Sequence, residues 1–382
     1  MKNFLFISHD ASRTGAPLVL LHFLKWLRKE HPSVTFDILL IRGGELTDSF
    51  RSLGDVFLRT ARHGFNQKDR AVVKLRKALG AENKWHIPHR SLMSPKYETV
   101  VANTVVSAKY LPFFHQKGIR TFCWLHELEY IIGDYYKPGE LLALSSYIDG
   151  FIAHSNAGRK MLMQMGIEKP VDVVYEFSDV EVNSLRNPTD VRKEWNIPSD
   201  GFVVGGCGTI EWRKGTDLFI QMADHLTKLY DKIYFVWVGA QLAENELDFR
   251  RIAHYLKHLA PDPQLIFTGK TNHPHDIFAA MDVFALTSRE DPFPLVCMEA
   301  AALGKPIICF DGAGGMPEFV SDDAGCTVPY GDTAAFSAAL VEFYSDRELI
   351  AQKGKCAYDK IQGPFAAAGL CRQLFDLISA RS

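Results

Sequence analysis

The sequence of 382 residues lacks several features that would assign a protein to a class at once. No run approaches the roughly 18 apolar residues that a membrane-spanning helix needs, and the apolar start Phe4–Ile7 is too short for a secretory signal. The 43 Lys+Arg nearly balance the 45 Asp+Glu, which argues against a dedicated nucleic-acid-binding protein. The seven cysteines are scattered and form no C-x-x-C, as is typical of reduced thiols. We therefore expect a cytoplasmic protein.

What the sequence does have is a regular alternation of short apolar runs and longer stretches with helical period, such as Pro17–Arg28. The runs predicted as strands are Phe4–Ile7, Phe36–Ile41, Thr99–Ala102, Arg120–Leu125, Gly150–Ala153, Phe202–Val204, Ile233–Val238, Gln264–Phe267, Val283–Leu286 and Pro306–Phe310. Continuous apolar strands are typical of parallel sheets that are covered on both faces. The predicted fold class is therefore α/β, with helical crossovers between parallel strands.

A polar, Pro- and Gly-containing stretch divides the two sets of strands near residues 177–200. We predict an N-terminal Rossmann-like domain at 1–177 and a C-terminal Rossmann-like domain at 178–362. Two doubly wound domains bind ligands at the carboxyl ends of their strands, so a cleft is expected there.

The segment from Gly205 to Asp217 follows a predicted strand and opens a helix. Its glycines, Gly208 among them, let the backbone approach a ligand, the helix N-terminus favours an anion, and Arg213 and Lys214 add positive charge. This pattern predicts a diphosphate site, although it fits neither the dinucleotide fingerprint nor a Walker loop. The alternative is a surface turn with two solvated basic residues.

A second segment places three acids, Glu290, Asp291 and Glu299, after a predicted strand and on the following helix. Ionised carboxylates accept hydrogen bonds from sugar hydroxyls, and a helix beginning near Pro294 would expose backbone amides in the stretch Phe293–Leu295. The alternative interpretation makes Asp291 a helix cap and Glu299 a partly buried ion-pair partner. Spacing alone does not separate the two.

Three further positions lie between predicted strands and helices: the glycine cluster from Gly312 to Glu318, the turn Gly15–Pro17, and His126. A lone histidine is more often a structural hydrogen-bonding residue than a catalyst, and a glycine cluster is equally a plain turn. The sequence contains no D-x-D, which weakens any interpretation that needs a metal-bound diphosphate.

Residues 56–96 carry ten Lys/Arg against Asp69 and Glu82, and Lys68–Leu79 has the pattern of a basic amphipathic helix. Such a helix binds an anionic membrane surface or an anionic acceptor. The alternative is a solvated face. Peripheral contact with the inner face of the membrane is thus one expectation for this stretch, and no nucleic-acid partner is expected.

Taken together, these segments resemble the retaining nucleotide-sugar glycosyltransferases of the GT-B fold, family-4 type. Arg213-Lys214-Gly215 resembles the phosphate-binding stretch of that family, Asp291 through Glu299 its E-x7-E motif, and Gly314 through Glu318 its G-G-x-P-E loop. The first domain matches more loosely, through Ser8-His9-Asp10, Gly15-Ala16-Pro17 and His126-Glu127.

The resemblance implies transfer of a hexosyl residue from a nucleoside diphosphate sugar to a glycan, glycolipid or small-molecule acceptor, with retention of configuration and with no metal or other cofactor. It implies catalytic roles for Arg213, Lys214, Asp291 and His126. It implies donor binding by Gly15, Gly208, Glu290, Phe293, Pro294, Leu295 and Glu299. It also implies that the last segment, 363–382, packs as a helix on the first domain.

Two positions depart from the family pattern. The first acid of the E-x7-E motif is the shorter Asp291, with Glu290 one position out of register, and Gly208 stands where an arginine is common. Two alternatives therefore remain beside the transferase: a sugar-nucleotide 2-epimerase on the same fold, and a degenerate glycosyltransferase-like partner protein without activity.

Overall fold

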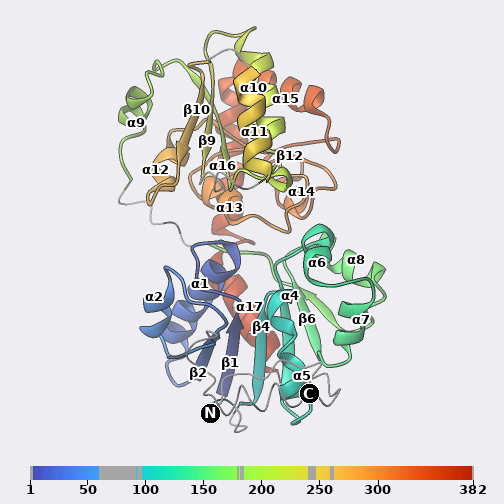
Figure 1. The fold of residues 1–382 in the computed structure, drawn as a ribbon. Coiled ribbons are helices and arrows are strands. Elements are labelled where there is room, and N and C mark those ends of the chain that lie inside the picture. Colours follow the sequence, from blue (N-terminus) through green and yellow to red (C-terminus); the bar gives the residue numbers. More distant parts are fainter. Residues whose placement is uncertain are drawn as a thin grey trace. The chain divides into compact units, whose positions relative to one another are not determined.

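The chain forms two units, which the computed structural model describes over residues 3–59, 92, 97–178, 180, 185–239, 247–258 and 262–380 (Figure 1). The first unit is Met1–Tyr175 together with Ala368–Ser382, and the second is Glu176–Ala367. The chain leaves the first unit after Tyr175, two residues before the boundary expected after residue 177. It returns after Ala367, five residues beyond the boundary expected after residue 362. The predicted basic helix Lys68–Leu79 lies outside the described residues.

The first unit is built on a seven-stranded sheet in which every neighbouring pair is parallel, in the order β3-β2-β1-β4-β5-β6-β7. The strands are β1 (Asn3–Ser8), β2 (Thr35–Leu40), β3 (Asp55–Leu58), β4 (Thr99–Asn103), β5 (Arg120–Leu125), β6 (Gly150–Ala153) and β7 (Val171–Val173). Strands β1, β2, β4, β5 and β6 are almost wholly buried, as the continuous apolar runs predict.

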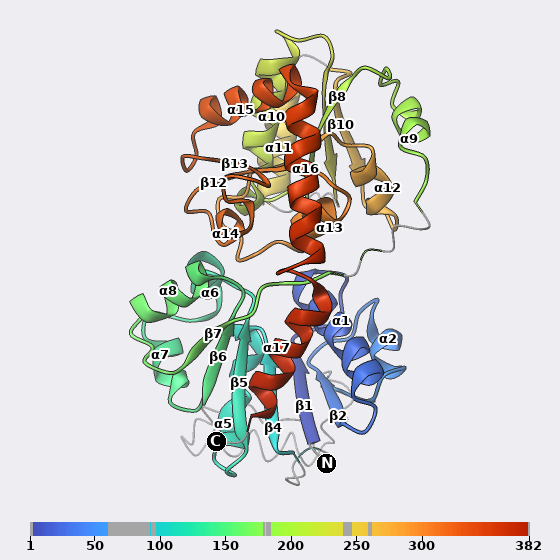
Figure 2. The same ribbon diagram turned by 180° about the vertical axis from the view of Figure 1, so that it is seen from behind.

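Helices cover this sheet on both faces. They are α1 (Gly15–Glu30), α2 (Thr47–Arg51), α4 (Val105–Ala108), α5 (Leu111–His115), α6 (Glu129–Tyr135), α7 (Glu140–Ser145), α8 (Asn156–Gln164) and α17 (Ala367–Ser379). Helix α17 lies across the sheet beside β1 and β4 (Figure 2). Its Phe375 ring lies 6.2 Å from that of Phe4, and Thr99 Oγ1 donates to the carbonyl of Ile378 at 3.2 Å. The end of the chain thus belongs to the first unit.

The second unit has a six-stranded parallel sheet in the order β10-β9-β8-β11-β12-β13. Its strands are β8 (Phe202–Cys207), β9 (Ile233–Val238), β10 (Leu265–Gly269), β11 (Val283–Leu286), β12 (Ile307–Phe310) and β13 (Gly325–Val328). Its helices are α9 (Pro188–Glu194), α10 (Thr216–Thr227), α11 (Leu247–His258), α12 (Pro274–Ala279), α13 (Leu295–Ala302), α14 (Met316–Val320), α15 (Thr333–Ser345) and α16 (Arg347–Gln362). The α/β class with two Rossmann-like units is confirmed.

The structure also describes the cysteines and the apolar character of the helices. All seven cysteines are free thiols. Among the described helices, none combines the length and the apolar character that crossing a bilayer requires.

The packing of α17 on the first sheet predicts the effect of removing one of its buried side chains. Leu374 is 1% exposed. Leu374→Ala should lower the free energy of unfolding of the first unit by about 2–5 kcal/mol, because it removes buried apolar contacts and leaves a cavity. The exposed neighbour Arg372 supplies the matched control, since Arg372→Ala should cost no more than about 0.5 kcal/mol. Chemical denaturation followed by circular dichroism measures both; equal effects would contradict the packing.

Candidate functional site

The turn that carries Lys214 is held against the end of strand β11. After β8 the chain forms a short 3-10 helix, Trp212–Lys214, and closes it at Gly215 with φ of 66°. A Cβ at Gly215 would lie 1.9 Å from the carbonyl oxygen of Thr287, so only glycine fits there. Two hydrogen bonds join the turn to the same strand end: Thr287 Oγ1 donates to the Lys214 carbonyl at 3.0 Å, and the Arg289 amide donates to the Arg213 carbonyl at 2.7 Å.

At this junction Lys214 forms a buried ion pair with Asp291. Lys214 Nζ donates to Asp291 Oδ2 at 2.5 Å, and the two side chains are only 16% and 7% exposed. Ser288 Oγ donates to the same oxygen at 3.2 Å, and the Asp291 amide donates to the Ala313 carbonyl at 2.7 Å. The structure therefore brings together two of the segments that the sequence singled out, which lie 77 residues apart.

The charge of Asp291 is fixed by these neighbours. Burial by itself raises the pKa of a carboxyl group, but the positive charges of Lys214 and Arg213 and the hydrogen bonds from Lys214 and Ser288 outweigh it. The pKa of Asp291 consequently lies below its ordinary value. The side chain is an ionised counter-charge and not a helix cap, since α13 begins at Leu295.

Arg213 lies beside the same carboxylate. Its Nη1 is 3.8 Å from Asp291 Oδ2 and donates to the Glu290 carbonyl at 2.9 Å, while Nη2 donates to Glu211 Oε1 at 2.9 Å. Its Nε is buried and has no hydrogen-bond partner in the described part of the chain. Two cations thus stand at the carboxyl edge of the second sheet, where α/β folds bind ligands.

The other predicted donor-binding residues of this unit lie on the same edge. Pro294 precedes α13, with extended backbone, and the side chains of Phe293 and Leu295 are buried. The first amides of a helix lack acceptors within it, so the start of α13 can bind an anion. The Gly315 amide donates to the Pro292 carbonyl at 3.0 Å, which joins the glycine cluster to this loop.

Glu299, on α13, has partners of its own. Ser178 Oγ donates to Glu299 Oε1 at 3.3 Å, and His275 Nε2 lies 3.5 Å from Oε2. The sequence left open whether Glu299 binds a ligand or is a partly buried ion-pair partner. The contacts are those of the second interpretation, and they leave a ligand role for this 13% exposed side chain as a prediction.

The two predicted glycines have different surroundings. Gly208 has φ of 153°, and a Cβ there would lie 3.2 Å from Lys214 Cγ, so its small size makes room for the lysine side chain. Gly15 opens α1 in the first unit, and a Cβ there would have nothing within 4 Å.

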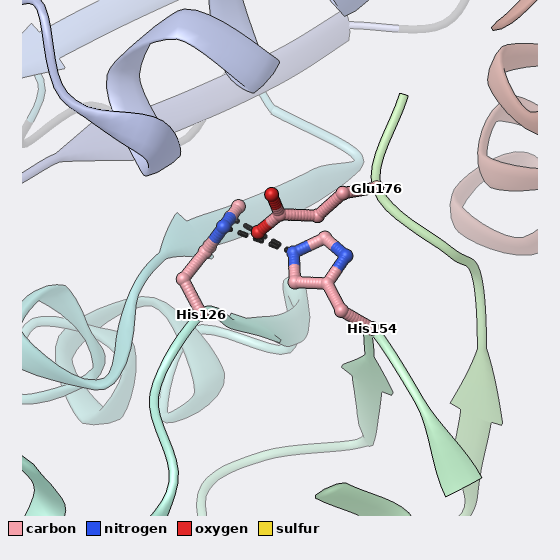
Figure 3. A group of neighbouring side chains, drawn as sticks. All are labelled: His126, His154 and Glu176. Carbon is pink, nitrogen blue, oxygen red and sulfur yellow. Dashed lines mark hydrogen bonds between the residues drawn. The ribbon is translucent and has the colours of Figure 1, made fainter. Parts of the chain in front are cut away.

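In the first unit, His126 follows β5 and is held from two sides, of which Figure 3 shows the side formed by His154. Its Nε2 lies 2.8 Å from Asn103 Oδ1, and its Nδ1 lies 2.9 Å from His154 Nε2. His154 Nδ1 in turn lies 3.0 Å from the Val174 carbonyl oxygen, so that nitrogen carries the proton. The imidazole of His126 is thereby fixed in place and is not a solvated side chain.

The same pair belongs to the one candidate metal-ligand group found among the described residues. Ligand atoms of His126, His154 and Glu176, where the chain passes from one unit to the next, lie within 4.8 Å of one another (Figure 3). Two imidazoles and a carboxylate are a donor set that zinc uses, and His154 already donates its other ring nitrogen to a carbonyl, as metal-bound histidines do. These residues could therefore hold a metal ion, although the sequence predicts none.

Sequence reasoning missed His154, Asn103 and Glu176. His154 follows the predicted strand Gly150–Ala153 just as His126 follows its own strand. The argument that drew attention to His126 therefore applies to His154 as well. Glu176 lies three residues beyond β7, a strand that the sequence analysis did not predict.

Comparison with known proteins agrees with this architecture. The family model for Glycosyl transferases group 1 matches residues 188–360. The E. coli O-antigen biosynthesis glycosyltransferase WclY is 30% identical over 169 residues, 44% of this chain and 42% of that protein. The Bacillus anthracis N-acetyl-alpha-D-glucosaminyl L-malate synthase is 26% identical over 207 residues, 54% of this chain and 52% of that one. The chain spans about half the length of these relatives.

Among solved structures, Anabaena Alr3699/HepE in complex with UDP and glucose matches with a TM-score of 0.78 at 19% identity, covering 100% of both chains. The two parallel α/β units therefore have the fold of GT-B glycosyltransferases. The match to the group 1 glycosyltransferase family covers most of the second unit, which is therefore similar to that family. The two curated relatives are named as a glycosyltransferase and a synthase, and neither is named as an epimerase.

The burial of the Lys214–Asp291 pair predicts a large cost when its carboxylate is removed. Asp291→Asn should lower the free energy of unfolding of the second unit by about 3–5 kcal/mol at neutral pH, because it leaves a buried cation without its partner. Lys355 and Asp359 form an ion pair of the same 2.5 Å length with 74% and 55% exposed side chains, so Asp359→Asn should leave the free energy of unfolding nearly unchanged. Urea denaturation of both variants tests this; a small effect of Asp291→Asn would contradict it.

The environment of His126 predicts a pH dependence. Burial, followed by the nearby His9, lowers the pKa of His126 to about 3. An unfolded histidine takes up a proton near pH 6.5, so between about pH 6.5 and pH 3 the unfolded state binds more protons. The free energy of unfolding should therefore fall on acidification through this range, by at most about 1.4 kcal/mol per pH unit from this residue.

Urea denaturation of the first unit at a series of pH values measures this contribution. His126→Gln should reduce the slope, whereas replacement of the exposed His225 should not. An unchanged slope in His126→Gln would show that the residue titrates alike in the folded and unfolded states.

Proposed function

We propose that the chain transfers a hexosyl residue from a nucleoside diphosphate sugar to a glycan, glycolipid or small-molecule acceptor, with retention of configuration and without a metal ion. The observation that carries the proposal is the Lys214–Asp291 pair with Arg213 beside it, at the carboxyl edge of the second sheet. The solved structures of the Anabaena protein contain UDP, UDP with glucose and UDP-glucose, which supports a uridine diphosphate sugar as the donor.

The chemistry needs stabilisation of the diphosphate as the glycosidic bond breaks. Lys214 and Arg213 supply positive charge for the leaving group, and the first amides of α13 supply hydrogen bonds. Asp291 holds Lys214 in place through their ion pair, so little reorganisation is needed when the anion arrives. Removing one such cation should lower kcat by about 10²- to 10³-fold, by analogy with loss of an oxyanion-hole donor.

The remaining predicted residues take supporting roles in this proposal. Glu299 binds the ribose, and Asp291 or Glu290 orients the donor sugar. His126, neutral at physiological pH because its pKa is lowered, contacts the sugar as a hydrogen-bonding group and does not carry charge. The first unit provides the acceptor site. The names of relatives in O-antigen and capsular polysaccharide biosynthesis support a carbohydrate acceptor.

A thermal-shift screen of nucleoside diphosphates tests the donor site. A ligand at a hundredfold excess over its Kd stabilises the native state by about 2.7 kcal/mol, so UDP should raise Tm clearly. The shift should be the same with Mg²⁺ and with EDTA, and it should be lost in Lys214→Ala. The exposed Lys228, paired with Asp224 on α10, gives the control: Lys228→Ala should keep the shift.

Three outcomes would contradict the proposal at different points. The absence of a shift with any nucleoside diphosphate would remove the donor site, and loss of the shift in EDTA would remove metal independence. Binding of the donor without turnover on a broad panel of acceptors would favour the degenerate, non-catalytic alternative. NMR of the product anomer then decides retention.

A further inference from the structure

Basic side chains gather where three strands of the first sheet end. The ends of β1, β2 and β3 are joined by backbone hydrogen bonds, from Ile41 to the Ser8 carbonyl at 2.9 Å, from Arg42 to the His9 carbonyl at 3.2 Å and from Arg59 to the Leu40 carbonyl at 2.9 Å. Arg42 and Arg59 therefore leave the sheet at adjacent positions of its carboxyl edge, the edge where α/β folds bind ligands.

A third cation, Lys109, is placed next to them by a buried tyrosine. The Tyr110 ring lies 5.0 Å from the Arg59 guanidinium carbon and 6.0 Å from Lys109 Nζ, and Arg59 Nη1 donates to the Tyr110 hydroxyl. We call Arg42, Arg59 and Lys109 the basic rim. The rim comes from two strand ends and the end of α4, so its geometry is fixed by the sheet.

The acids of the described chain only partly balance the charge of the basic rim. Arg42 lies 3.4 Å from Asp10, but its side chain is 72% exposed, and Asp10 also accepts hydrogen bonds from Ser12. The Nε of Arg59 is buried and has no hydrogen-bond partner among the described residues. Burial, with the positive charges of Arg59 and Arg42, lowers the pKa of Lys109, so the three cations repel one another.

We propose that the basic rim binds a phosphate group carried by the acceptor. The inference rests on the proposed function, because it supplies the acceptor side of the same transfer. A phosphate carries more than one negative charge and several acceptor oxygens, and the guanidinium fork of the exposed Arg42 matches it in a two-point contact. Arg59, whose Nη1 donates to the Tyr110 hydroxyl, adds positive charge beside it. The positive charge of Lys109 balances the remaining negative charge of the phosphate. A single carboxylate would leave part of the positive charge unbalanced.

Calorimetric titration with inorganic pyrophosphate tests the basic rim directly. The donor site also prefers diphosphates, so the titration uses the full chain carrying Lys214→Ala. Pyrophosphate should still bind at one site, and Arg42→Gln or Lys109→Gln in the same background should each weaken the binding about tenfold. Arg42 is a surface side chain, so its replacement should leave the fold intact, as circular dichroism will verify.

The matched control is Arg51→Gln, which removes an exposed arginine paired with Asp48 on α2 of the same unit. It should leave pyrophosphate binding unchanged. Absence of binding in the Lys214→Ala chain would overturn the proposal, as would binding that Arg42→Gln and Lys109→Gln leave intact or that Arg51→Gln weakens equally. The UDP shift of the wild-type chain is measured separately, so failure of the donor site and failure of the basic rim are distinguishable.

The phosphate can belong to a soluble sugar phosphate or to a lipid headgroup, and vesicles separate these sources. Co-sedimentation with phosphatidylcholine vesicles containing phosphatidic acid, lost in Arg42→Gln and Lys109→Gln, would assign the phosphate to a lipid-borne acceptor. Pyrophosphate binding without co-sedimentation would assign it to a soluble acceptor. Both results support the basic rim. Co-sedimentation that neither variant reduces, without pyrophosphate binding, would overturn it.

Discussion

The arrangement of the second unit depends on one buried ion pair. Lys214 and Asp291 lie on turns that follow different strands, and their side chains meet at 2.5 Å with little solvent around them. Placing two charges there has a desolvation cost, which close contact and the hydrogen bond from Ser288 to Asp291 offset. Because the turn of Lys214 is also hydrogen-bonded to the end of β11, the cation cannot move away without breaking several contacts.

The same edge of the two sheets carries different sets of polar and charged side chains. In the second unit the carboxyl edge carries a fixed lysine and arginine with an acid between them. In the first unit it carries the His126–His154 pair and the basic rim of Arg42, Arg59 and Lys109. At this edge of a parallel sheet the loops can vary in sequence while the strands stay buried. The same architecture can therefore bind two different ligands.

The sequence predicted the central strands well and the edge strands poorly. Four strands, β5, β6, β9 and β11, have the predicted bounds because their apolar runs are continuous and buried. The missed strands β3, β7 and β13 form three of the four edges of the two sheets, and only the fourth edge strand, β10, was predicted. An edge strand is covered less completely, so polar residues such as Asp55 and Asp172 are tolerated and the apolar pattern is weak.

The site shows the same division. Local pattern identified Lys214, Asp291 and His126 because each follows a strand, and glycine or proline marks the turns around Lys214 and Asp291. The local pattern could not show that Lys214 and Asp291 are partners, because they are 77 residues apart in the sequence. Their distance depends on how the ends of β8 and β11 lie beside each other in the sheet. The partners of His154 and the residues of the basic rim could not be predicted for the same reason, because they depend on which strand ends are neighbours in the sheet.

The placement of α17 affects the order in which the chain can fold during synthesis. The first unit lacks this helix until the whole of Glu176–Ala367 has been translated. At about 5–20 residues per second that takes on the order of 10 to 40 s. During this time the sheet face around Phe4 lacks its contact with Phe375. A nascent chain of this kind exposes an apolar surface to chaperones and to other chains. Helix α17 can therefore close the first unit only after the second unit has been synthesised.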